Sequence, residues 1–113
     1  SQNGWLANGS DFPVESINPL FGFYAAVARK DQNNFPEGGF EMKNALTRME
    51  ALKAMTIWAA AANFEDEEKG SLETGKVADF VVLDRDIMTV AEAELFKATV
   101  EATYINGEKV YDR

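Results

Sequence analysis

The 113-residue chain contains neither cysteine nor histidine. Without cysteine it forms no disulfide and supports no thiolate chemistry, which fits a reducing compartment, and we expect a cytoplasmic protein. Without histidine it offers no imidazole, a common ligand of protein-bound zinc. Positive charge is also scarce, since 11 lysines and arginines stand against 19 aspartates and glutamates, a formal net charge of −8. Nucleic acid and anionic membrane surfaces are therefore excluded as expected partners, because both would repel the chain.

Long hydrophobic runs are absent as well. No apolar stretch approaches the roughly 20 residues of a membrane-spanning helix, and the first residues show no basic-then-apolar signal pattern. Hydrophobic residues nevertheless make up 46% of the sequence, which is ordinary for a globular protein. The length and composition fit one domain with a core of its own.

A short strand-like stretch at 4–7 opens the chain, and a helix is predicted to follow at about 19–30. Asn18 can cap the first turn of this helix, and Pro19 takes the first helical position, where a missing N–H costs nothing. The basic pair at 29–30 places positive charge near the negative end of the helix. Its apolar residues share one face: Leu20, Phe23, Tyr24 and Val27.

Residues 31–46 are rich in turn formers, and a second helix is predicted at 47–63. Thr47 and Glu50 have the spacing of a capping box, in which each side chain bonds the backbone N–H of the other residue. Apolar residues recur at helical spacing along this segment: Leu52, Met55, Ala59 and Ala62. This is the strongest helix signal in the sequence.

From Gly70 onward the pattern changes from a helical period to that of strands. A continuous apolar run at 80–83 predicts a strand buried on both faces, and a short helix is expected within 90–98. We therefore expect a small, mainly antiparallel sheet over 70–111 and an α+β fold for the chain.

A hairpin is predicted at the end of the chain. The Asn-Gly dipeptide at 106–107 separates two β-prone runs and favours a type I′ turn, because both central positions need a positive φ. A two-residue loop places Ile105 opposite Glu108 and Thr103 opposite Val110. The turn supports this hairpin better than the weak alternation of its strands does.

A specific motif lies near the start of the chain. The run Gly-Ser-Asp-Phe-Pro-Val-Glu at 9–15 resembles the motif on the eighth barrel strand of the amidohydrolase superfamily. Other stretches extend the resemblance in the order of the family: 19–20, 24–27, 29–31, 46–48, 69–72 and 75–84. The branch that the chain resembles is amidohydrolase family 3, large metal-dependent hydrolases that include N-substituted formamide deformylases.

This resemblance implies a particular origin for the chain. Family members combine a (β/α)8 barrel with a composite β-sandwich built from both chain ends. The chain would then be a C-terminal fragment, with residues 1–69 derived from the barrel (its last strand and helices) and residues 70–113 derived from the sandwich, including the terminal hairpin. The eighth-strand aspartate of the family binds the metal or takes a proton from its water. Asp11 matches that position, so the resemblance implies that Asp11 is a catalytic general base and a metal neighbour in the intact parent, with zinc or another divalent metal as cofactor.

The chain departs from the family pattern in two ways. It lacks every histidine ligand, and a (β/α)8 barrel needs about 250 residues. We therefore expect the chain alone to be inactive and to bind zinc no better than a single surface carboxylate does. The resemblance implies that the parent hydrolyses amide or other C–N bonds with a metal-activated water. Its expected partners are the remainder of the parent chain and a small-molecule substrate.

The alternative is a free-standing, non-catalytic α+β module for interaction or self-association. The first five residues contain no initiator methionine and no capping signal, which favours the fragment hypothesis. Strands taken out of a barrel or a sandwich present open edges, which tend to pair with another chain. We therefore expect the isolated chain to self-associate.

Several of these residues also have a purely structural interpretation. Asp11 could cap a turn. Glu15 and Ser16 could line a substrate mouth, although the sequence favours a solvated loop. The acidic run at 65–68 lacks the spacing of a calcium loop and is predicted to be a solvated helix end. Residues 84–86 are predicted to be a strand-ending turn.

Overall fold

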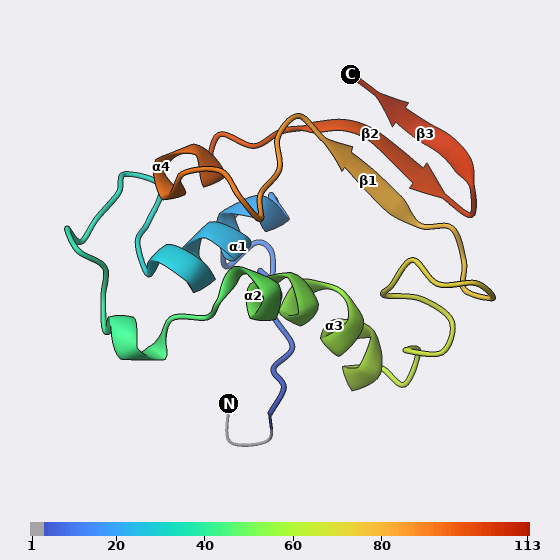
Figure 1. Cartoon of the computed structure of the whole chain (residues 1–113), viewed down its shortest axis with the longest axis horizontal. Helices are drawn as coiled ribbons and strands as arrows, with labels where there is room; N and C mark the ends of the chain where they lie inside the picture. The colour runs from blue at the N-terminus through green and yellow to red at the C-terminus, as the bar shows by residue number, and fades with distance from the viewer. Residues whose placement is uncertain (1–3) are drawn as a thin grey trace.

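The computed structural model describes residues 4–113, so that the first three residues of the segment predicted to derive from a barrel lie outside it. Short helices precede a small sheet along the chain, and one more short helix lies between the first two strands (Figure 1). In order, the elements are α1 (Pro19–Ala28), the 3-10 helix η1 (Met42–Asn44), α2 (Arg48–Met55), α3 (Ile57–Ala62), β1 (Phe80–Leu83), α4 (Glu92–Leu95), β2 (Val100–Ile105) and β3 (Glu108–Asp112). The strands form an antiparallel sheet in the order β1-β2-β3, which confirms the predicted α+β class.

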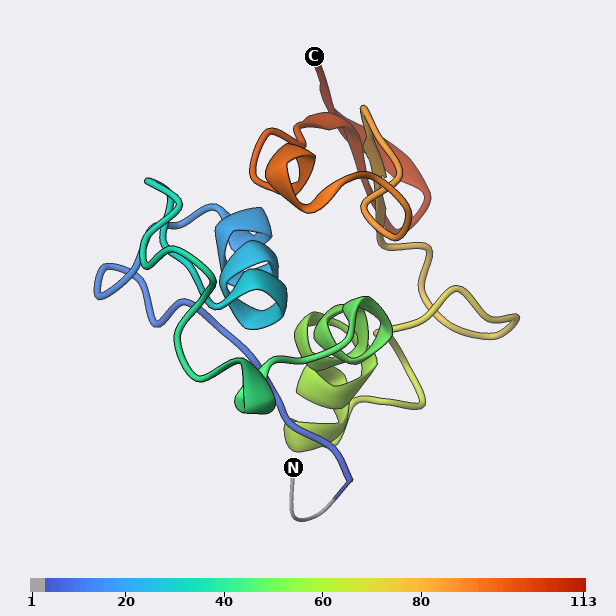
Figure 2. The same cartoon turned by 60° about the vertical axis from the view of Figure 1, so that its left-hand side comes forward.

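The helix α1 contacts both α2 and α4, and in Figure 1 it is drawn between α2 below and α4 with the sheet above. Turned by 60°, the molecule shows α4 beside the sheet, with α2 and α3 as a separate group below them (Figure 2). None of the helices in residues 4–113 combines the length and the hydrophobicity needed to cross a membrane.

The start of α1 follows the prediction, but its end does not. The Oδ1 atom of Asn18 accepts the Leu20 N–H at 3.1 Å, and Pro19 opens the helix. The helix ends at Ala28, because Arg29 takes a left-handed conformation (φ 55°) and its N–H closes the last turn. The basic pair at 29–30 thus lies beyond the last turn of the helix.

The helix predicted at 47–63 is two helices, α2 and α3. Its capping box is confirmed, since the Thr47 N–H donates to Glu50 Oε2 at 2.8 Å and the Glu50 N–H donates to Thr47 Oγ1 at 3.2 Å. The break comes at Thr56 (φ −124°, ψ −99°), whose hydroxyl donates to the carbonyl of Leu52 at 2.6 Å. A threonine hydroxyl that bonds back to the preceding turn competes with the helical ladder, so the prediction of one unbroken helix was wrong.

The hydrophobic core packs α1 and α2 against the segment around α4. Leu95 is fully buried with Phe23 and Tyr24 of α1. The Tyr24 ring meets the Phe96 ring edge to face at 5.6 Å, and its hydroxyl donates to Asn34 Oδ1 at 2.7 Å. The buried cluster comprises Leu20, Phe23, Tyr24, Ala28, Ala51, Ile87, Leu95 and Ala98.

The strand predicted at 80–83 is β1, but it is not buried on both faces. Val81 and Val82 are 51% and 45% exposed, because no other segment in residues 4–113 covers them. On the sheet, Phe80 lies opposite Tyr104, and the two rings stack at 4.5 Å. The apolar run therefore predicted the strand correctly and its burial wrongly.

The terminal hairpin is confirmed with one change of register. Asn106 and Gly107 have φ of 50° and 80°, the signs that a type I′ turn needs, and Ile105 pairs with Glu108. Thr103 pairs with Tyr111 and not with Val110, because a bulge interrupts the ladder after Thr103. One extra residue on β3 therefore shifts the predicted pairing by one position.

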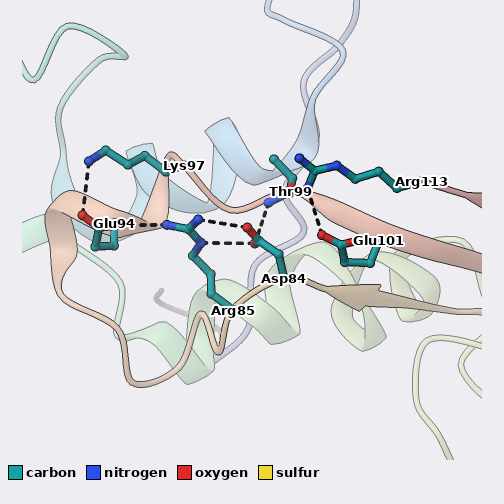
Figure 3. A network of polar contacts seen from close by, with 7 residues as sticks. All are labelled: Asp84, Arg85, Glu94, Lys97, Thr99, Glu101 and Arg113. Atoms are coloured by element: carbon teal, nitrogen blue, oxygen red, sulfur yellow. Dashed lines mark hydrogen bonds and ion pairs between the residues drawn. The ribbon is translucent and has the colours of Figure 1, made fainter.

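Polar contacts tie the end of β1 to β2 and α4 (Figure 3). Asp84 follows β1 directly, as the predicted strand-ending turn requires, and its Oδ1 accepts the Thr99 N–H at 2.9 Å. The Asp84 N–H in turn donates to the Thr99 carbonyl at 3.0 Å. Arg85 bridges Asp84, at 2.9 Å, and Glu94 of α4, at 2.8 Å (Figure 3).

Candidate functional site

The segment before Asp11 lies against α2. Residues 4–10 form no strand, so the strand-like stretch predicted at 4–7 is not matched in this chain. The Asn8 N–H instead donates to the carbonyl of Ala54 at 2.9 Å. That carbonyl belongs to the last turn of α2, just before the break at Thr56. This hydrogen bond fixes the backbone at Asn8, three residues before Asp11, against the end of α2.

Asp11 itself begins a closed turn. It takes a left-handed conformation (φ 49°), which aspartate tolerates better than most residues. The Val14 N–H donates to the Asp11 carbonyl at 2.9 Å, and the Glu15 N–H donates to the Ser10 carbonyl at 3.2 Å. Asp11 thus occupies a turn that backbone groups close, and its exposed side chain does not cap it, as the structural interpretation predicts that it would. No hydrogen bond or ion pair joins its carboxylate to another residue of the described range.

A cavity of about 640 Å³ lies beside this turn. Its walls come from the 8–16 segment, from α1 and from the loop that follows α1. Glu15 and Ser16 line it and are exposed, which agrees with the solvated loop that the sequence favours for them. Asp11 is next to the lining residue Ser10 but does not itself line the cavity.

The loop after α1 folds back and forms one wall of this open cavity. The Phe40 N–H donates to the Arg29 carbonyl at 2.9 Å, and the Leu46 N–H donates to the Ala26 carbonyl at 3.0 Å. The Asp31 N–H also donates to the Phe35 carbonyl at 2.8 Å, and both Phe35 and Phe40 line the cavity. The turn-rich sequence predicts a loop there but not this docking. The aromatic residues within this loop are the feature of the sequence from which its docking could have been predicted.

The residues that the structure describes do not by themselves make a metal site. Within residues 4–113 no group of three or more histidine, cysteine, aspartate or glutamate side chains lies close enough together to hold an ion. The acidic run at 65–68 forms a turn two residues after α3, and Lys69 binds Glu65 at 2.8 Å. This contact lowers the pKa of Glu65 and raises that of Lys69. One exposed carboxylate, that of Asp11, is an incomplete donor set for zinc.

Comparison with known proteins bears directly on the motif at 9–15. The model of the Amidohydrolase family matches residues 1–111. The chain belongs to the amidohydrolase family. The motif around Asp11 and the stretches that follow it therefore lie within a family match that spans nearly the whole chain.

Individual amidohydrolase relatives support this assignment. The chain is 33% identical over 107 residues to YtcJ of Bacillus subtilis (strain 168), which covers 95% of the chain and 20% of the relative. It is 38% identical over 104 residues to N-substituted formamide deformylase of Arthrobacter pascens, covering 92% of the chain and 19% of that enzyme. The chain thus spans about a fifth of the length of these curated relatives.

A solved structure extends the likeness to the fold. The crystal structure of an amidohydrolase from Thermotoga maritima MSB8 superposes with a TM-score of 0.52 and 30% sequence identity. The superposition covers 64% of this chain and 17% of that one. The fold of the 113-residue chain is therefore similar to a limited part of the much longer Thermotoga maritima protein.

Proposed function

We propose that this chain is the C-terminal part of a longer metal-dependent hydrolase that cleaves amide or other C–N bonds, and that Asp11 is its general base. The observation that carries the proposal is the family match over residues 1–111, which includes the motif Gly9–Glu15. The proposal that the bond cleaved is a C–N bond is supported by the relative named N-substituted formamide deformylase. The great length of the relatives supports a parent in which most of the site lies outside this chain.

In this proposal Asp11 accepts the proton of the attacking water. A general base must reach the proton that it removes and must have free lone pairs. The Asp11 carboxylate is exposed, and within residues 4–113 it makes no hydrogen bond or ion pair that would occupy its oxygens. The closed turn fixes the backbone on both sides, which limits the positions that the carboxylate can take.

Metal chemistry would have to depend on residues outside this chain. Zinc or another divalent ion would lower the pKa of a bound water toward neutrality. Since the chain supplies one candidate carboxylate and no histidine, we propose that the remaining ligands come from the rest of the parent. The isolated chain is accordingly proposed to be inactive.

The two halves of the chain are proposed to have different origins. Residues 1–69, which hold Asp11 and the helices α1 to α3, would belong to the last strand and helices of a barrel. Residues 70–113 would supply closing strands of a composite sandwich. The exposed faces of the sheet support this assignment, because they offer apolar surface that further strands could cover.

The test is Asp11→Asn in the longer protein, assayed on a simple N-substituted formamide. Loss of the base should lower kcat by about 100-fold or more, because positioned general bases contribute roughly 10²–10⁴. The matched control is Asp66→Asn, which removes an exposed carboxylate in the acidic run and should leave kcat unchanged. A variant at position 11 with at least half of the wild-type kcat would remove Asp11 from the mechanism.

A further inference from the structure

Asparagine is followed by glycine at three places in the chain, 3–4, 8–9 and 106–107, of which the first begins outside the described residues. An asparagine before glycine is prone to lose its amide, because glycine has no Cβ to keep its own nitrogen away from the asparagine side chain. Of the other two pairs, one ends two residues before Asp11 and the other forms the turn between β2 and β3 (Figure 1). The structure gives these two pairs different surroundings.

The pair in the hairpin is held by hydrogen bonds at both residues. The Asn106 N–H donates to Asp79 Oδ1 at 2.7 Å, and the Gly107 N–H donates to the Ala78 carbonyl at 2.9 Å. Both residues also have the positive φ of the type I′ turn, 50° and 80°. The Gly107 nitrogen can attack the neighbouring side chain only after its N–H has left the Ala78 carbonyl. The folded hairpin should therefore protect Asn106, although this residue is exposed.

The pair before Asp11 lacks this protection. The Asn8 N–H donates to the Ala54 carbonyl, but within residues 4–113 neither the Gly9 N–H nor the Asn8 side-chain amide makes a hydrogen bond. Gly9 is exposed and has no left-handed φ, and Asn8 is half-buried with its Nδ2 atom next to Gly22 of α1. The nitrogen that must attack is therefore free of any partner that it would first have to leave.

We propose that Asn8 is a site of spontaneous deamidation in the folded chain, and that Asn106 is protected despite the same dipeptide. The Gly9 nitrogen gives its proton to the solvent and forms a bond to Cγ of Asn8. The Cγ–Nδ2 bond breaks, and the amide nitrogen takes up a proton and leaves as ammonia. Water then opens the resulting succinimide ring at either carbonyl. The products are aspartate and isoaspartate at position 8, and each carries one negative charge more than asparagine at neutral pH.

The modification falls in the segment that leads to Asp11. Isoaspartate continues the main chain through its side-chain carbonyl, which adds a methylene group to the backbone after position 8. The backbone thereby becomes longer between the hydrogen bond to Ala54 and the turn at 10–15. This inference concerns the 113-residue chain and does not depend on the proposed function, so either can fail without the other.

The test compares the folded 113-residue chain with the same chain in denaturing urea, both at mildly alkaline pH. Tandem mass spectrometry of samples taken over time measures aspartate and isoaspartate at each asparagine separately. In urea the two pairs should react at rates within about threefold of each other, because each is then an Asn-Gly dipeptide in an unfolded chain. In the folded chain Asn106 should react about tenfold more slowly than Asn8, since its hydrogen bonds must open first.

Two variants of the folded chain test the cause at each pair. Gly9→Ala should slow the reaction at Asn8 by about tenfold and leave Asn106 unchanged, because a Cβ hinders the attack. Nothing lies within 4 Å of the position that this Cβ would take, so the fold should be kept. Asp79→Ala removes the acceptor of the Asn106 N–H and should speed the reaction at Asn106 by about threefold to fivefold. Circular dichroism checks the fold of both variants.

Three results would overturn the inference. The first is a rate at Asn106 equal to or faster than that at Asn8 in the folded chain. The second is a rate at Asn8 in the folded chain below about a tenth of its rate in urea, since the fold would then protect this pair as well. The third is an unchanged rate at Asn8 in Gly9→Ala. An unchanged rate at Asn106 in Asp79→Ala would contradict protection by that hydrogen bond.

Discussion

At the scale of single residues, Asp84 is the carboxylate most strongly engaged by its surroundings. Its hydrogen bonds with the Arg85 side chain and with the Thr99 N–H hold the pKa of Asp84 well below its ordinary value of 3.8. A carboxyl group whose pKa is lower in the folded state than in the unfolded chain stabilises the fold above its unfolded pKa. That stabilisation is lost as the pH falls from there toward the folded pKa.

We expect Asp84→Asn to lower Tm at pH 7 and to change how Tm depends on pH. The wild-type chain should lose stability as the pH falls below about 4, whereas the variant should lose less over that interval, because it has no charge to neutralise at this position. Thermal melts at steps of pH and at two salt concentrations measure this, and high salt should reduce the difference. Parallel profiles for the two chains would contradict the assignment.

At the scale of elements, Gly70 allows the chain that follows α3 to return in close contact with that helix. It has φ of 93°, and a Cβ placed there would lie 2.8 Å from Ala60 Cβ and 2.9 Å from Ile57 Cα. The close approach therefore needs glycine for two separate reasons, the backbone conformation and the missing side chain.

The matched control for Gly70→Ala is Gly75→Ala. Gly75 has a similar φ of 95°, but nothing lies within 4 Å of the position its Cβ would take. Gly75→Ala should cost about 1 kcal/mol of backbone strain. Gly70→Ala should cost that and about 1–3 kcal/mol more from overpacking. Urea midpoints of the two variants measure the difference. Equal losses would show that the contact with α3 relaxes without cost.

Elements that depend on local chemistry could be predicted from the sequence. The Thr47–Glu50 capping box and the Asn-Gly turn at 106–107 are made by neighbouring residues, and both formed as expected. The break at Thr56 and the exposed faces of β1 could not be predicted in this way. Whether a threonine interrupts a helix, and whether an apolar strand is covered, depends on what packs against it.

The candidate site likewise has one part that the sequence predicted and another part that only the structure shows. Asp11 came from the motif at 9–15, which belongs to the family match. The cavity came from the return of the 29–46 loop onto α1, which no short pattern in the sequence indicates. The position of Glu15 on the wall of this cavity therefore needed the structure, because it depends on the fold of a loop distant in the sequence.

At the scale of the whole molecule, much apolar surface is uncovered. Val14, Phe64 and Leu72 are exposed, and so are both faces of the sheet around Val82. The sheet has two open edges, because β1 and β3 each pair with β2 alone among the described strands. The two edges differ in charge. β3 contains Glu108, Lys109 and Asp112, whereas all four residues of β1 are apolar.

This difference predicts which edge leads to self-association of the isolated chain. Charged residues on an edge strand oppose pairing with another chain, and an uncharged apolar edge promotes it. We expect the wild-type chain to sediment as dimers or larger species, and Val82→Lys to shift it toward the monomer. Val110→Lys places the same charge on β3 and should change little, because that edge already carries charge. A monodisperse wild-type monomer at high concentration would contradict self-association, and equal effects of the two lysines would remove β1 as the edge responsible.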